Sequence, residues 1–164
     1  MHDTLGVQLS PEEISATVVS RLESLYRKHL PLLEGARDTV IALARVWRLA
    51  LASSANRPII ELVLDLAELA QDFAATVSSE EVPRGKPAPD VYLEAARRLD
   101  AAPSSCVAVE DSSNGIRSAA AAGMTVIAVP NREFPPSPDA LALAREVLDS
   151  LTQLTPEHVR RVAA

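Results

Sequence analysis

The chain has 164 residues, which suits one ordinary domain, and 48% of them are hydrophobic, which is enough for a core. The formal net charge of −6 argues against a nucleic-acid partner, because proteins that bind the phosphate backbone present a basic face. The single cysteine, Cys106, excludes an internal disulfide and favours a cytoplasmic location. Residues 1–10 have neither a basic start nor an apolar run, so we expect no signal peptide, and no apolar stretch is long enough for a membrane span.

The first half of the chain alternates helical patterns with short apolar runs. Ser10 followed by Pro11 and two acidic residues is typical of a helix start. The apolar spacing predicts helices from residue 11 to about 29, from about 36 to 45 and from 58 onward, and strands at 49–52 and 74–77.

The second half begins with a loop at 82–90, because three prolines and a glycine cannot continue a helix or a central strand. Asp90 is expected to have a structural role, as a cap for the following helix. Helices are predicted at 91–99, 114–122 and 139–144, and strands at 106–109 and 125–129. Short apolar strands that alternate with helices favour an α/β fold with a parallel sheet, whose ligands bind beyond the carboxyl ends of the strands.

Two adjacent carboxylates, Glu110 and Asp111, end the strand at 106–109. Such a pair is costly to bury unless a cation relieves the repulsion, and Mg²⁺ prefers oxygen ligands of this kind. An equally weighted alternative is that Asp111 and Ser112 only cap the next helix.

Three segments in order resemble motifs of the haloacid dehalogenase superfamily, in its β-phosphoglucomutase and phosphatase-like branch with a helical cap. They are Leu49 to Ser54, Gly85 to Asp90 and Val109 to Gly115. The resemblance implies a three-layer, Rossmann-like α/β core over residues 33–164, with residues 1–32 as the remnant of a helical cap domain.

The resemblance also implies roles for particular side chains. Ser53 and the backbone of Ser54 would bind a phosphate oxygen, and Lys86 would neutralise the phosphate, so that Ser53 and Lys86 are the candidate catalytic residues. Asp111 would bind Mg²⁺, with Glu110 as a second ligand or as a partner that orients the site. The substrate would be a small phosphorylated metabolite.

The first motif of this superfamily is a strand that ends in Asp-x-Asp and supplies the nucleophile, and it has no counterpart here. We interpret the partial similarity of Asp3-Thr4-Leu5 to this motif as a coincidence. We therefore expect no activity from this chain alone and weak Mg²⁺ binding at best. The missing strand is the central one in the family. Either the strands at 49–52 and 106–109 pair directly, or self-association or another chain fills the position between them.

These observations favour a phosphatase or phosphomutase of the superfamily, represented by a shortened and inactive chain. The alternative is a non-catalytic binding or assembly module that is derived from the same fold. An unrelated receiver-like α/β protein is disfavoured, because the Gly-Lys-Pro-Ala-Pro-Asp loop has no place in it.

Overall fold

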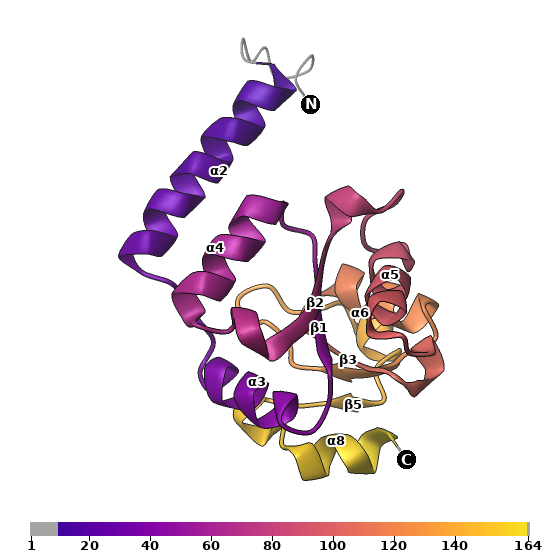
Figure 1. Ribbon diagram of the computed structural model, residues 1–164. Coiled ribbons are helices and arrows are strands. Elements are labelled where there is room, and N and C mark those ends of the chain that lie inside the picture. The colour runs from indigo at the N-terminus through magenta and orange to yellow at the C-terminus, as the bar shows by residue number, and fades with distance from the viewer. Residues whose placement is uncertain (1–9, 164) are drawn as a thin grey trace.

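The computed structural model describes residues 10–163 and has an α/β fold (Figure 1). Its main helices are α2 (Pro11–Lys28), α3 (Ala36–Ala44), α4 (Arg57–Ala67), α5 (Asp90–Leu99), α6 (Ser113–Ala121), α7 (Pro138–Leu141) and α8 (Pro156–Ala163). The strands are β1 (Leu49–Ser53), β2 (Phe73–Ser78), β3 (Val107–Glu110), β4 (Thr125–Ala128) and β5 (Glu146–Val147). The predicted elements from residue 11 to residue 129 are therefore present, with boundaries that move by one or two residues. No helix among the described residues is long and apolar enough to cross a membrane.

Helices cover both faces of the strands and so make three layers. Side chains alternate along β4: Val126 and Ala128 pack with α5, α6 and α7, whereas Ile127 packs with α3 and α8. This alternation with a period of two is what a strand buried on both faces requires. A third apolar cluster lies under α4 and includes Leu51 of β1.

The strands in the described part of the chain form two separate parallel sheets, β1–β2 and β3–β4–β5. Of the two expected alternatives, direct pairing of the strand at 49–52 with the strand at 106–109 is therefore wrong, and a second copy or another chain between them stays a prediction. Each sheet instead packs against its own helix, α5 on β1 and β2 and α6 on β3 and β4, and a cavity separates the facing edges of β1 and β3.

Helix α2 lies beside α4, and its amino end extends away from the sheets (Figure 1). It begins at the predicted cap: the Ser10 hydroxyl accepts a hydrogen bond from the Glu13 backbone N–H, and the Glu13 carboxylate accepts one from the Ser10 N–H. This reciprocal capping box explains the start of the helix. The assignment of residues 1–32 to a cap domain stays a prediction, and Asp3-Thr4-Leu5 lies outside the described residues.

Two local expectations need correction. Asp90 does not cap the helix that follows it: α5 begins at Asp90 itself, its side chain makes no capping bond, and its carboxylate pairs with Arg84 at 2.9 Å. The helix predicted at 139–144 covers only Pro138–Leu141, and β5 and α8, for which no element was predicted, follow it. In α8 the buried residues Val159 and Val162 pack with Leu43 of α3.

Candidate functional site

Lys86 lies in the loop between β2 and α5, and its ammonium is held at the carboxyl end of β3. The loop is fixed from α6, where the Ser118 hydroxyl donates a hydrogen bond to the carbonyl of Ala88 at 2.6 Å. Lys86 Nζ pairs with Glu110 Oε1 and lies 4.9 Å from the centre of the Tyr92 ring. The Lys86 side chain is 11% exposed and that of Glu110 is 5% exposed, so this is a buried charge pair.

The Glu110 carboxylate is fully engaged by protein groups. Oε1 accepts hydrogen bonds from Lys86 Nζ and from the Tyr92 hydroxyl. Oε2 accepts from the Asp111 backbone N–H at 3.2 Å and from the Ser112 hydroxyl at 3.3 Å. A buried carboxylate needs such partners, because unpaired it would be strongly destabilising. Of the two expected roles for Glu110, this geometry favours a partner that orients the site, because both carboxylate oxygens are already engaged and neither is left for direct metal coordination.

Gly115 in the first turn of α6 makes room for this carboxylate. A Cβ built on Gly115 would overlap both Glu110 carboxylate oxygens and their carbon. Glycine is thus required here by close approach. The Gly115 backbone N–H donates to the Ser112 hydroxyl at 3.1 Å, so Ser112 is the helix cap, as one of the two readings of this stretch anticipated.

Tyr92 belongs to the site, although none of the three motifs contains it. It is 7% exposed in the first turn of α5, and its hydroxyl donates to Glu110. Burial, and after it the negative charge of Glu110, raises the pKa of Tyr92 well above its usual range. The hydroxyl therefore stays protonated and donates. One available signal was that Tyr92 is one of two tyrosines in a chain with 3% aromatic residues, six positions after Lys86.

Asp111 follows Glu110 and is half-buried. Burial, and after it the charge of Glu110, raises the pKa of this carboxyl above its ordinary value. Within residues 10–163 no three or more His, Cys, Asp or Glu side chains converge on a point that could hold a metal ion. Because Mg²⁺ needs near-octahedral oxygen coordination and Glu110 is engaged, Asp111 alone does not complete a Mg²⁺ site. The described residues therefore do not fit this metal by themselves.

Ser53 and Ser54 follow the carboxyl end of β1. The Ser53 hydroxyl accepts a hydrogen bond from the Ala55 backbone N–H at 3.1 Å, which fixes the turn into α4. Ser54 is exposed. Within residues 10–163 neither serine is hydrogen-bonded to Lys86 or Glu110, but all four residues line one cavity.

That cavity has a volume of about 1270 Å³ and runs between the facing edges of the two sheets. We call it the β1–β3 groove, because every residue of β1 and of β3 lines it. Its polar end holds the predicted site residues Ser53, Ser54, Lys86, Glu110 and Asp111. The structure thus brings all five to the carboxyl ends of the strands, where ligands of parallel α/β sheets bind.

Known proteins are similar to this chain in sequence and in fold. The chain is 40% identical over 148 residues to hexitol phosphatase B of Escherichia coli (strain K12), an alignment that covers 89% of this chain and 66% of that protein. The structure matches CbbY from Rhodobacter sphaeroides, solved in complex with phosphate, with a TM-score of 0.82 and 29% identity over 90% of this chain and 67% of that one.

A third match is β-phosphoglucomutase from Clostridium difficile, with a TM-score of 0.76 and 25% identity over 94% of this chain and 69% of that one. The chain spans slightly less than two thirds of the length of the curated relative, 66%. The family model for haloacid dehalogenase-like hydrolase matches residues 4–123, well over half of the sequence. The chain therefore belongs to the haloacid dehalogenase-like hydrolase family.

Proposed function

We propose that this chain carries the phosphate-binding half of a phosphatase or phosphomutase site for a small phosphorylated metabolite, and that it does not turn over substrate by itself. The observation that carries the proposal is the buried Lys86–Glu110 pair at the polar end of the β1–β3 groove, with Ser53 on the same groove. The named relatives, a hexitol phosphatase and a β-phosphoglucomutase, support this class of substrate.

Lys86 is suited to the phosphate group. An ammonium has three N–H donors, and the contacts with Glu110 and the Tyr92 hydroxyl use two of them. The third can be directed to an anion in the groove. The Glu110 carboxylate holds the ammonium in place, so little freedom is lost when a phosphate binds.

The carboxylates limit how well an anion binds. Glu110 and Asp111 together place two carboxyl groups beside one ammonium, and a phosphate dianion would add more negative charge. Mg²⁺ would reduce this repulsion, with Asp111 as its contact, but further oxygen ligands would have to come from elsewhere. We therefore expect phosphate binding to be weak and Mg²⁺ binding to be weaker than in a complete site.

The test is a titration of the full chain with inorganic phosphate, followed by ³¹P NMR line width, with and without Mg²⁺. The expected result is saturable binding that weakens about tenfold or more in Lys86→Ala, since a charge-assisted hydrogen bond contributes about 1.5–3 kcal/mol. Ser53→Ala keeps the Lys86–Glu110 pair intact and should also weaken binding, so the test does not depend on whether Lys86→Ala folds.

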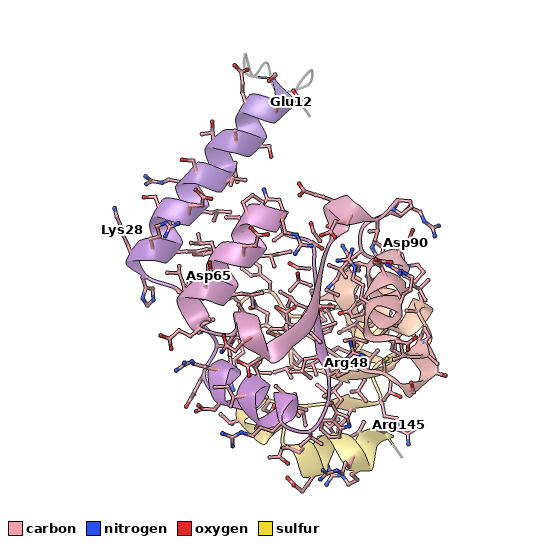
Figure 2. The ribbon with its side chains drawn as sticks, in the orientation of Figure 1. Glu12, Lys28, Arg48, Asp65, Asp90 and Arg145 are labelled. Atoms are coloured by element: carbon pink, nitrogen blue, oxygen red, sulfur yellow. The ribbon has the colours of Figure 1, made fainter. Side chains whose placement is uncertain are left out.

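Lys28 provides a matched control, because the chain has two lysines and Lys28 is exposed at the end of α2, far from α5 (Figure 2). Lys28→Ala should bind phosphate like the unaltered chain. Equal binding by Lys28→Ala and Lys86→Ala, or no saturable binding by the unaltered chain, would contradict the proposal.

A second candidate function is a non-catalytic binding or assembly module. The observation in its favour is that the β1 and β3 edges along the groove are unpaired in the described part of the chain. If the chain binds both phosphate and another polypeptide, both functions are supported. If it binds a polypeptide but no phosphate, the non-catalytic binding or assembly module is favoured.

A further inference from the structure

We propose that the β1–β3 groove binds one extended, uncharged, apolar polypeptide segment as a parallel β-strand that joins the two sheets into one. This inference does not depend on the phosphate site. It starts from the edges: among the described residues β1 pairs only with β2, and β3 pairs only with β4. Each edge presents backbone N–H and C=O groups that require partners when they are buried.

Both edges run in the same direction, so a single strand can pair with both. Arg48, directly before β1, donates to the Leu99 carbonyl at 2.8 Å, and β3 follows the short segment after Leu99. At the other end, the Lys86 loop that follows β2 contacts Glu110 at the end of β3. The amino ends of β1 and β3 thus lie at one end of the groove and the carboxyl ends at the other.

The walls of the groove specify an apolar occupant. Among the described residues, the charged ones that line the groove lie at its two ends: Arg48 before β1, and Lys86, Glu110 and Asp111 at the carboxyl ends. Between these ends the lining is dominated by aliphatic side chains from both layers of helices, including Leu43 of α3, Ala95 of α5 and Val159 of α8. A segment that matches this charge distribution is uncharged along its length and apolar on both faces.

Side-chain exposure also indicates that the groove is unfilled apolar space. Val109 of β3 is 38% exposed, and all five residues of β1 are only half-buried, although helices cover both faces of this fold. Strands in the middle of a parallel sheet are normally buried on both faces. One strand of about five residues, about 16 Å long, would match the length of β1.

The length of the relatives indicates a source for such a segment. This chain aligns with 66% of hexitol phosphatase B and covers 67% of the CbbY chain. About a third of each of these two proteins is therefore not matched by this chain. The length of its edges and the chemistry of its lining suit the groove to a strand from such a segment, supplied by a separate chain and bound by β-augmentation.

The test uses a fluorescein-labelled synthetic peptide with the apolar core Val-Ile-Val-Ile-Val and two glutamates at its amino end, which would lie beside Arg48. The peptide is titrated with the full chain and followed by fluorescence anisotropy. Two control peptides separate the contributions. One carries N-methyl groups at all core amides and cannot donate a backbone hydrogen bond to either edge, and the other has lysines in the core. Each control peptide should bind at least about tenfold more weakly than the apolar peptide, because main-chain hydrogen bonds and burial of apolar side chains provide the affinity.

Two variants of the chain locate the site. Val109→Lys places a charge in the groove, whereas Val147→Lys places it on β5, at the far edge of the second sheet and outside the groove. Both valines are exposed, 38% and 50%, so both variants should fold. Val109→Lys should weaken peptide binding about tenfold and Val147→Lys should not.

Four results would overturn the proposal: no binding of the apolar peptide, equal binding of the N-methylated peptide, equal losses in the two variants, or a chain that sediments as a dimer which Val109→Lys dissociates. The last result would mean that a second copy occupies the groove.

Discussion

Replacing Gly115 by alanine is predicted to destabilise the protein, although alanine is the better helix former. Gly115 is buried in the first turn of α6, and a Cβ there would overlap the Glu110 carboxylate. The carboxylate would have to turn away, and its bonds to Lys86, Tyr92 and Ser112 would weaken or break together.

The magnitude follows from two opposing effects. Alanine in place of glycine within a helix stabilises by about 0.5–1 kcal/mol. Disruption of a buried charge pair costs about 3–5 kcal/mol, because it leaves an uncompensated charge in the interior. The net prediction for Gly115→Ala is a loss of about 2–4 kcal/mol in the free energy of unfolding.

Urea denaturation followed by circular dichroism measures this loss, with Asn114→Ala as the control. Asn114 is exposed on the same turn, so its replacement should change stability by less than about 0.5 kcal/mol. In a Glu110→Ala background a Cβ at position 115 no longer meets a carboxylate, so adding Gly115→Ala should leave the free energy of unfolding unchanged or raise it. A single Gly115→Ala variant as stable as the unaltered chain would refute the reasoning.

Two further predictions concern α5. Tyr92→Phe removes one donor from the buried Glu110 carboxylate and should reduce the free energy of unfolding by about 1–3 kcal/mol in urea denaturation, whereas Tyr26→Phe on α2 should have little effect. Hydrogen bonds from Arg97 and the next arginine lower the pKa of Glu94 to about 2 from 4.5. Its contribution to stability is therefore present above pH 4.5 and is lost as the pH falls toward 2. Glu94→Gln should show a smaller drop in melting temperature than the unaltered chain across that range, and an equal drop would contradict this assignment.

Much of the fold could be predicted because its signals are local. The Ser10 cap, the apolar runs of β1 and β3 and the proline-rich Lys86 loop are each fixed by nearby residues. The alternation of strands and helices then places the ends of the strands together, which is why Ser53, Lys86 and Asp111 were predicted at one site.

The rest depends on contacts between distant residues. The engagement of Glu110 by Tyr92, and the space that Gly115 leaves for it, involve three elements that meet only in the folded chain. The groove likewise depends on how the two sheets and their helices are arranged in space, which no local pattern records. Asp90 could not be assigned correctly, because whether it caps or pairs depends on where Arg84 lies.

The central claim is that this chain holds one half of a phosphoryl-transfer site. Hydrolysis of p-nitrophenyl phosphate with Mg²⁺ tests it most directly, when the unaltered chain is compared with Lys86→Ala and Asp111→Ala. We predict that none of the three exceeds the background rate, because the described residues offer no further carboxylate beside Glu110 and Asp111 in the groove. Turnover by the unaltered chain that either substitution abolishes would contradict the claim and would mean that another carboxylate of this chain serves as the nucleophile.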